Sequence, residues 1–267
     1  CMVKTLSFHS PIFVPANRPE RFSKAASSGA DAVILDLEDS VAVSEKVFAR
    51  SMLSDNFTEL PIIVRVNAAG TEWHNDDIDA VRNRKYTAIM LPKCECPRAV
   101  ESVITESGGR TPIFAIIESA AGLVHARSIA ALAGVDRLVF GSIDYCADMR
   151  CAHHRDILLP ARLELVLASR LANISAPIDG VTTRLDDMSI TKEDAEHARN
   201  VGMGGKLCIH PKQINLVQAA FTPSKQEIDW AKRVLSSTGG VLMVSGEMVD
   251  EPVRIRALQI MEAVSDG

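Results

Sequence analysis

Short apolar runs rich in Ile, Val and Leu alternate along the chain with longer stretches in which apolar and charged positions follow a helical period. Each run has the length of a strand buried on both faces, and each longer stretch has room for one crossover helix. The alternation predicts repeated βα units around a parallel sheet. The candidate strands are Pro11–Val14, Ala32–Leu37, Ile62–Val66, Ala88–Leu91, Pro112–Ile117, Arg137–Phe140, Ile178–Val181 and Lys206–Ile209.

Amphipathic stretches of helical length separate these runs. The candidate helices are Arg18–Ser27, Val43–Asp55, Asn75–Asn83, Pro97–Glu106, Gly122–Leu132, Leu158–Ala172 and Thr191–Val201, followed by Ser224–Ser236. Beyond Gly239–Gly240, the tail Val241–Asp266 has strand-like and then helical character. We therefore predict an α/β fold, a (β/α)8 TIM barrel at about residues 11–222 with a C-terminal extension at about 223–267, in a single domain.

A doubly wound open sheet would show a similar alternation of strands and helices, and it remains an alternative. Such folds often carry a G-x-G-x-x-G motif or a P-loop after an early strand, and neither motif follows an early run here. The sequence also shows no internal repeat and no low-complexity tract. The count of eight runs favours the barrel.

Composition excludes several classes of function. A net charge of -5 gives no basic excess for binding nucleic acid. No window approaches 18 uninterrupted apolar residues, so we expect no membrane span and a cytoplasmic protein. The six cysteines include no C-x-x-C pair, so we expect reduced thiols and no zinc site.

Acidic residues follow two consecutive runs. In a parallel barrel, functional side chains gather at the carboxyl ends of the strands. Glu118 follows the fifth run and Asp144 follows the sixth, so their carboxylates can converge. Two carboxylates with open positions suit Mg2+ bound together with a chelating substrate. The alternative is that each acid caps the helix after its strand.

Arg65 lies inside the apolar run Ile62–Val66, where a permanent charge needs an anionic partner. That partner is either a substrate carboxylate or developing enolate, or a structural ion pair with Asp36 or Glu38; both can hold together. Asp36, Glu38 and Asp39 form a cluster of like charges that needs a cation nearby, unless these acids are simply solvated at a loop entrance.

His210 ends the eighth run, directly before Pro211. A lone histidine is more often packed or hydrogen-bonded than catalytic, so we interpret His210 as a pocket-lining residue. The remaining histidines form no constellation that indicates zinc.

Several motifs, in this order, resemble the citrate lyase β-subunit-like group of the HpcH/HpaI aldolase superfamily. They are FVPANRPER at 13–21, AVILDLEDSV at 32–41, VRVN at 64–67, IIESAAG at 116–122, FGSIDY at 140–145, APIDGV at 176–181 and GKLCIHPKQI at 205–214. The resemblance extends from Pro11 to about Leu258.

The resemblance implies roles for individual residues. Glu118 and Asp144 correspond to magnesium ligands, and Arg65 to the arginine that holds the substrate's carboxylate and the carbonyl that forms the enolate. The positions expected to bind the rest of a coenzyme A thioester are Arg18 and Lys24 at its phosphates, and Phe13, Ile209 and His210 in the pocket.

The segment 246–252 is similar to one that, in malyl-CoA and citramalyl-CoA lyases, lends an aspartate to the neighbouring subunit's active site. This implies that Asp250 is a catalytic acid/base acting in trans and that the protein is a homo-oligomer, a trimer or hexamer. From the residues alone, Asp250 is an acid before a proline turn.

The resemblance implies a carbon–carbon lyase that uses Mg2+, with Mn2+ as a possible substitute, and cleaves a coenzyme A thioester of a short hydroxy acid. We expect (3S)-citramalyl-CoA to give acetyl-CoA and pyruvate, with malyl-CoA and citryl thioesters as alternatives. Asp36 or Glu38 would take the hydroxyl proton, and Asp250 would protonate the enolate carbon. An aldolase acting on a free hydroxy acid and an inert subunit of a lyase complex remain alternatives.

Overall fold

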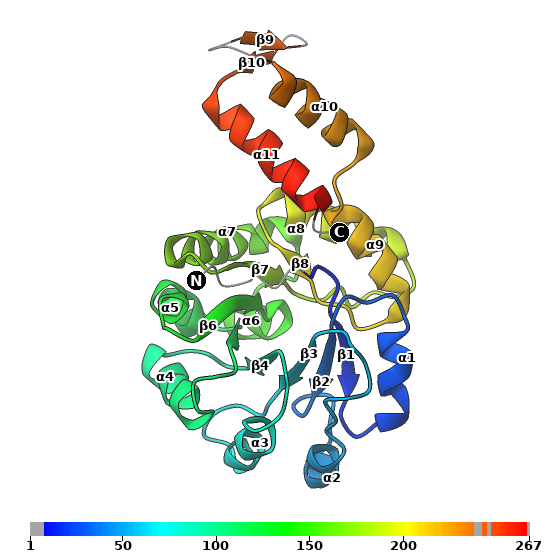
Figure 1. Cartoon of the computed structure of the whole chain (residues 1–267). Coiled ribbons are helices and arrows are strands. Elements are labelled where there is room, and N and C mark those ends of the chain that lie inside the picture. The colour runs from blue at the N-terminus through cyan, green and yellow to red at the C-terminus, as the bar shows by residue number, and fades with distance from the viewer. Residues whose placement is uncertain (1–7, 238–241, 245–246, 266–267) are drawn as a thin grey trace. The chain divides into compact units, whose positions relative to one another are not determined.

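Each of the eight apolar runs forms a strand of one parallel sheet, and the strands lie in chain order (Figure 1). The computed structural model describes residues 8–237, 242–244 and 247–265. The strands are β1 (Ile12–Pro15), β2 (Val33–Asp36), β3 (Ile62–Arg65), β4 (Ala88–Leu91), β5 (Ile113–Ile117), β6 (Val135–Phe140), β7 (Ser175–Asp179) and β8 (Gly205–Lys206).

Backbone hydrogen bonds join the first strand to the chain around the last. The N–H of Phe13 donates to the carbonyl of Cys208 (3.0 Å), and the N–H of Cys208 donates to the carbonyl of Pro11 (2.9 Å). Ile12 and Cys208 also pair in parallel. The sheet therefore closes on itself, and the predicted TIM barrel is confirmed.

Helices follow the strands and cover the outside of the barrel (Figure 1). They are α1 (Phe22–Ala26), α2 (Lys46–Ser51), α3 (His74–Val81), α4 (Pro97–Glu106), α5 (Ala120–Ala130), α6 (Ser142–Met149), α7 (Arg155–Ala172), α8 (Met188–Asn200) and α9 (Pro211–Phe221). Single 3-10 turns, η1 (Pro19–Arg21) and η2 (Val43–Glu45), precede α1 and α2.

Two helices were not predicted. The sixth strand ends at Phe140, as predicted; the backbone of Gly141 leaves the extended conformation, and α6, which carries Asp144, begins at the next residue. Helix α9 starts at Pro211, whose ring suits the first turn of a helix. The side-chain oxygen of Gln213 accepts the N–H groups of Ile209 and His210 just before this helix.

The last two strands end earlier than predicted, at Asp179 and Lys206 in place of Val181 and Ile209. The chain turns away at Gly180, where a Cβ atom would lie 2.9 Å from the carbonyl oxygen of Phe140. The predicted ranges therefore included loop residues that line the mouth of the barrel.

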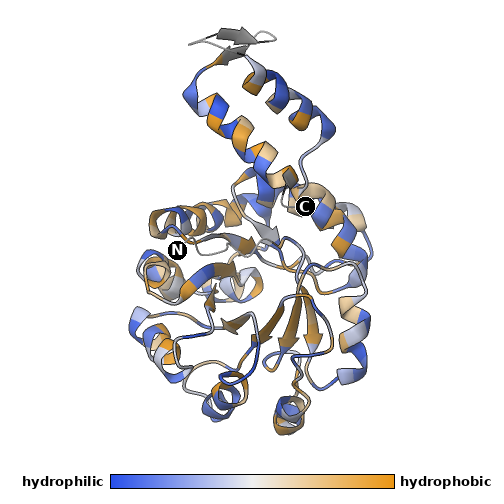
Figure 2. Cartoon of the chain, viewed as in Figure 1, coloured by the Kyte–Doolittle hydropathy of each residue, from blue (hydrophilic) through white to orange (hydrophobic). Residues whose placement is uncertain are grey.

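The barrel interior is filled by apolar side chains, and the strands that carry them have mostly hydrophobic colours in Figure 2. The rings of Phe8 and Phe114 pack with their centroids 6.0 Å apart, and Ile34, Ile63 and Met90 of the same cluster are completely buried. Burial of this set is the main stabilising contribution of the barrel. Because the lower part is packed, side chains that bind ligands have room only at the carboxyl ends of the strands.

The chain divides into two compact units, residues 1–218 and 219–267. In the second unit, α10 (Lys225–Ser236) begins with a capping box formed by Ser224 and Glu227. The hairpin β9 (Leu242–Val244) and β10 (Glu247–Val249) and the helix α11 (Glu251–Ser265) follow. The core of this unit contains Ala231, Val234, Val249, Ala257 and Ile260. A strand-like and then helical tail is therefore confirmed.

Within residues 8–237, 242–244 and 247–265, every helix falls short of the length and apolar character that crossing a bilayer requires. The five cysteines in the same ranges are free thiols, as predicted.

Candidate functional site

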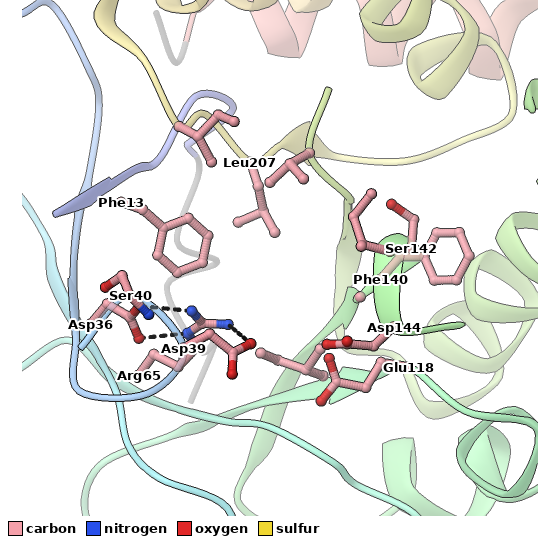
Figure 3. A pocket seen from close by; sticks show the side chains of 15 residues that line it. Phe13, Asp36, Asp39, Ser40, Arg65, Glu118, Phe140, Ser142, Asp144 and Leu207 are labelled. Carbon is pink, nitrogen blue, oxygen red and sulfur yellow. Dashed lines mark hydrogen bonds and ion pairs between the residues drawn. The ribbon is translucent and has the colours of Figure 1, made fainter. Parts of the chain in front are cut away.

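A pocket of about 380 Å3 opens at the carboxyl ends of the strands (Figure 3). Apolar side chains of Phe13, Ile116, Phe140, Val181, Leu207 and Ile209 form much of its wall. Its polar lining includes Asp36, Asp39, Arg65, Glu118 and Asp144. The pocket thus brings together residues that the sequence places far apart.

Arg65, at the end of β3, makes two short hydrogen bonds to the carboxylate of Asp36 at the end of β2, both 2.7 Å. Its third nitrogen, Nη1, lies 3.0 Å from Glu38 Oε2, and its guanidinium lies over the ring of Phe13, 4.8 Å from the centroid. The structural ion pair considered from the sequence is therefore present. Because Arg65 also lines the pocket, the ion pair leaves it able to face a bound anion.

The two acids next to Arg65 differ in protonation behaviour. Burial raises the pKa of Asp36, but the charge and hydrogen bonds of Arg65 outweigh it and hold that pKa below its usual value. Burial, with the charges of Asp39 and Asp36, raises the pKa of Glu38 to about 7 although Arg65 opposes the rise. Asp36 is thus a fixed anion, and Glu38 can exchange a proton near neutral pH.

Glu118 directly follows β5, and Asp144 lies in the first turn of α6. Figure 3 shows both carboxylates on the same side of the pocket. Burial raises the pKa of Glu118 to about 8; a hydrogen bond from the N–H of Lys93 opposes this rise, while the charges of Glu38 and Asp144 add to it. The convergence predicted for Glu118 and Asp144 is therefore observed, although Asp144 belongs to a helix and not to a strand end.

The donor atoms of this pair fit a hard divalent cation. Glu118 is only 6% exposed, and a buried carboxylate crowded by other acids is stabilised by a cation. Gly141 leaves space for the Glu118 side chain, since a Cβ atom at position 141 would collide with it. Among the described residues no group of three or more His, Cys, Asp or Glu forms a closed metal cage. Two carboxylates with open positions suit Mg2+ or Mn2+ better than structural zinc.

Lys93 is a site residue that the sequence analysis missed. It follows β4 in a left-handed backbone conformation, with φ 53°. Its N–H donates to Glu118 Oε1 (2.7 Å), and its Nζ lies 4.0 Å from Glu38 Oε1. Burial lowers the pKa of the Lys93 ammonium, but nearby carboxylates, Glu118 first, outweigh this and raise it. In the surrounding sequence LPKCECP, the position of Lys93 just after a predicted strand was the available signal for a site residue.

A second pocket, of about 660 Å3, adjoins the first and shares Phe13 and Ile209 with it. Lys24 and His210 line it, as does Arg21, which the sequence analysis did not single out. Arg18 is not among its lining residues; its side chain is half exposed and lies 3.4 Å from Glu20. The other four residues expected to bind the thioester all line this second pocket: Phe13, Lys24, Ile209 and His210.

Asp250 belongs to the second unit. Its Oδ1 accepts the N–H of Val253 in the first turn of α11, so within its own unit Asp250 caps a helix. This agrees with the reading of an acid before a proline turn, since Pro252 lies in the same turn.

A buried ion network at the ends of β7 and β8 was also missed. Asp179 is bound by Arg162 of α7 (2.7 Å) and by the ammonium of Lys206 (3.0 Å), and all three side chains are fully buried. Burial raises the pKa of Asp179, but Lys206 and Arg162 outweigh it and hold that pKa below its usual value. Both Asp179 and Lys206 lie in motifs quoted from the sequence, yet their pairing requires the strand register.

Comparisons with known proteins agree with this geometry. Residues 9–211 match the sequence profile described as HpcH/HpaI aldolase/citrate lyase, and residues 166–263 match that described as C-C bond lyase of the TIM-barrel fold. The citrate lyase subunit beta-like protein of Mycobacterium tuberculosis (strain ATCC 25618 / H37Rv) is 36% identical over 267 residues, which cover 96% of this chain and 95% of that protein.

A second relative is the (3S)-malyl-CoA thioesterase of Cereibacter sphaeroides (strain ATCC 17025 / ATH 2.4.3), which is 32% identical over 95% of this chain and 93% of its own. Among solved structures, protein CitE from Mycobacterium tuberculosis in complex with magnesium, acetoacetate and coenzyme A superposes with a TM-score of 0.86. It is 34% identical, and the match covers 97% of this chain and 99% of CitE.

Proposed function

Because the chain belongs to the HpcH/HpaI aldolase/citrate lyase family, we propose that it is a magnesium-dependent carbon–carbon lyase that cleaves a coenzyme A thioester of a short hydroxy acid. The observation that carries this proposal is the convergence of Arg65, Glu118 and Asp144 in one pocket at the carboxyl ends of the strands. The pocket combines oxygen ligands for a cation with a fixed positive charge for an anionic substrate.

In the reaction, the substrate hydroxyl loses its proton and becomes a ketone while the adjacent carbon–carbon bond breaks. The electron pair of that bond passes to the carbon next to the thioester carbonyl, which becomes an enolate and then takes a proton to give acetyl-CoA. Mg2+, or Mn2+ in its place, would be held by Glu118 and Asp144 and would polarise the hydroxyl and carboxylate oxygens of the substrate.

This chain's own residues account for the remaining requirements. Arg65 stabilises the negative charge that develops on the thioester oxygen, because Asp36 holds its guanidinium in place through two hydrogen bonds. Glu38, with its pKa raised to about 7, is better suited than Asp36 to take the hydroxyl proton near neutral pH. The apolar wall around Phe13 and Leu207 limits the access of water to the enolate.

The adjoining pocket is the proposed binding site for coenzyme A. Lys24, Arg21 and His210 line this pocket together with several apolar side chains, which suits a ligand with phosphates and a long flexible arm. The related CitE of Mycobacterium tuberculosis was solved with coenzyme A and magnesium, which supports a thioester over a free hydroxy acid. The side chain of Arg18 is half exposed, and Arg18 shortly precedes Arg21 and Lys24 in the chain. We retain it as a candidate for binding the phosphates of coenzyme A.

The preferred substrate is (3S)-citramalyl-CoA, which would give acetyl-CoA and pyruvate; malyl-CoA and citryl thioesters are the alternatives. These acyl groups differ by little more than one substituent, which changes binding by about 1–3 kcal/mol. The relative named (3S)-malyl-CoA thioesterase favours a second candidate reaction, in which the thioester is hydrolysed and free coenzyme A is released.

The proposal includes a homo-oligomer, a trimer or hexamer, in which Asp250 of one subunit protonates the enolate in the site of another. The support is the resemblance of segment 246–252 to the corresponding segment of malyl-CoA and citramalyl-CoA lyases. The match of the second family profile across residues 166–263 includes Asp250.

A substrate panel tests the proposal. Purified protein is given citramalyl-CoA, malyl-CoA and citryl-CoA, with and without Mg2+, and acetyl-CoA and free coenzyme A are separated by chromatography. We expect one thioester to give acetyl-CoA in a reaction that EDTA and Glu118→Ala both abolish. Release of free coenzyme A alone would indicate the thioesterase reaction, and the absence of turnover by a folded protein would refute both.

A further inference from the structure

Lys93 adopts a left-handed backbone conformation, with φ 53°, although it does not end a helix. Three non-glycine residues of the described chain have positive φ: Lys93, Arg150 and Asn173. Arg150 and Asn173 end α6 and α7, where a left-handed residue commonly terminates a helix. Lys93 follows a strand and ends no helix. Such conformations persist where neighbouring contacts enforce them, and they cluster at functional sites.

The contacts on both sides of Lys93 hold this conformation. The N–H of Cys94 donates to the carbonyl of Ile116 (3.2 Å), and the Cys94 thiol donates to the carbonyl of Leu91 (3.2 Å). The N–H of Lys93 itself donates to Glu118 Oε1 (2.7 Å). The loop is therefore anchored to β4 and β5, and it fixes one oxygen of Glu118. The Lys93 side chain lines a separate pocket beside the site, together with Glu38 and Asp39.

The surroundings of Lys93 are strongly negative. Five carboxylates lie in or beside the pocket, those of Asp36, Glu38, Asp39, Glu118 and Asp144. Arg65 is the one cation among the pocket's described lining residues, and two of its nitrogens donate hydrogen bonds to Asp36. The ammonium of Lys46 donates hydrogen bonds to the carbonyls of Leu37 and Glu38 and to Asn67 Oδ1, at 2.6–2.8 Å.

Lys93 differs from these two cations because its side chain is half exposed and its Nζ lies 4.0 Å from Glu38 Oε1, which is longer than their hydrogen bonds. An anionic substrate that enters a site with five carboxylates needs a further positive charge to offset the repulsion.

We propose that Lys93 is a positioning residue whose ammonium offsets the crowded carboxylates, so that the anionic hydroxy acid or keto acid binds beside the divalent metal. The proposal rests on the function proposed above, and it assigns to Lys93 a part in substrate binding. The backbone N–H of the same residue orients Glu118, so one residue serves both the metal ligand and the anion.

An electrostatic role of Lys93 can be distinguished from a structural one, because loss of its charge should change metal affinity and anion affinity in opposite directions. Removal of a nearby cation strengthens the binding of a positive metal and weakens the binding of a negative ligand. A residue that only supports the loop would, when replaced, weaken both. The half-exposed ammonium is partly screened by water, so we expect changes of about threefold to tenfold in each dissociation constant.

The test compares Lys93→Met with the wild type, with Lys93→Arg as the variant that keeps the charge. Lys85→Met is the matched control, because it removes the same charge from the exposed loop at the other end of β4. Mn2+ affinity is measured by electron paramagnetic resonance with Mn2+ alone. Pyruvate affinity is then measured by calorimetry at saturating Mn2+, and circular dichroism checks that each variant is folded.

We expect Lys93→Met to bind Mn2+ more tightly and pyruvate more weakly, each by about threefold or more, and Lys93→Arg and Lys85→Met to stay within twofold of wild type. Weakening of both ligands, or no change in pyruvate affinity, would overturn the proposal. If Lys93→Met does not fold, Lys93→Gly removes the same charge and suits the left-handed backbone. Neither readout requires turnover, so failure here is distinguishable from failure of the lyase assignment.

Discussion

The environment of Glu38 in the candidate site disfavours the ionised form of its carboxyl. It is 6% exposed, and the charges of Asp36 and Asp39 add to the effect of burial. In an unfolded chain its carboxyl would ionise near the ordinary value, whereas in the folded protein its pKa is about 7. Ionised Glu38 therefore reduces the stability of the fold above neutral pH.

We predict that Glu38→Gln stabilises the protein at pH 8.5 and has no such effect at pH 4. Below the unfolded pKa the carboxyl is protonated in both states, and the difference grows as pH rises towards 7 and then stays constant. The expected gain is about 1–3 kcal/mol, measured by urea unfolding. Glu72→Gln, at an exposed position, is the control and should change stability equally little at both pH values. An equal effect of Glu38→Gln at pH 4 and 8.5 would contradict this account.

At the same scale, the sequence identified Arg65, Glu118 and Asp144 because charged residues next to apolar runs are conspicuous. Lys93 was missed because its role depends on a left-handed backbone angle, which a lysine in a polar loop does not signal. Arg162 was missed for another reason, since its partner Asp179 lies on a different element and the pair forms only when α7 packs on β7.

At the scale of elements, the junction of β6 and α6 determines how the two acids meet. Gly141 joins them, and a Cβ atom at this position would contact the Glu118 side chain and lie 2.9 Å from Ile116 Cγ2. Its φ of -82° is accessible to alanine, so the glycine is required for space and not for backbone conformation.

We predict that Gly141→Ala lowers Mn2+ affinity at least tenfold while the protein remains folded, because Glu118 must move away from Asp144. Electron paramagnetic resonance measures the affinity. Gly180→Ala is the matched control, since its Cβ would crowd Ser142 and the carbonyl of Phe140 in place of Glu118. Wild-type affinity in a folded Gly141→Ala protein would show that Glu118 is not a ligand.

The strands were predictable because each is an apolar run of four to six residues apart from the short β8, and α4 was predicted at its observed bounds. Helix α6 was not, because its eight residues follow β6 after the single residue Gly141 and form no separate amphipathic stretch of helical length. Helix α9 was missed because its start depends on Gln213, whose side chain bonds Ile209 and His210, and a single glutamine gives no helix signal.

At the scale of the whole molecule, the chain carries the proposed metal ligands in one compact unit and Asp250 in the other. The closed parallel barrel could be predicted from eight alternating units, because it is their common arrangement. The strand register could not, and pairs such as Asp179 and Lys206 depend on it. How subunits assemble could not, since an intermolecular contact leaves no periodic pattern in a single sequence.

We predict that Glu118→Gln and Asp250→Asn chains, each inactive alone, regain activity when they are unfolded together and refolded as a mixture. If Asp250 acts in trans, mixed oligomers contain sites with a wild-type barrel from one chain and a wild-type Asp250 from another. About a quarter of the sites would then be intact at equal mixing. Activity that stays at the level of the single variants would show that Asp250 acts within its own chain or not at all.

The proposed lyase reaction breaks a carbon–carbon bond of the substrate and leaves its thioester intact. The most direct measurement quantifies both products from citramalyl-CoA in the presence of Mg2+. We expect acetyl-CoA and pyruvate in equal amounts, with neither formed by Glu118→Ala. Consumption of the thioester with release of free coenzyme A and citramalate would contradict it.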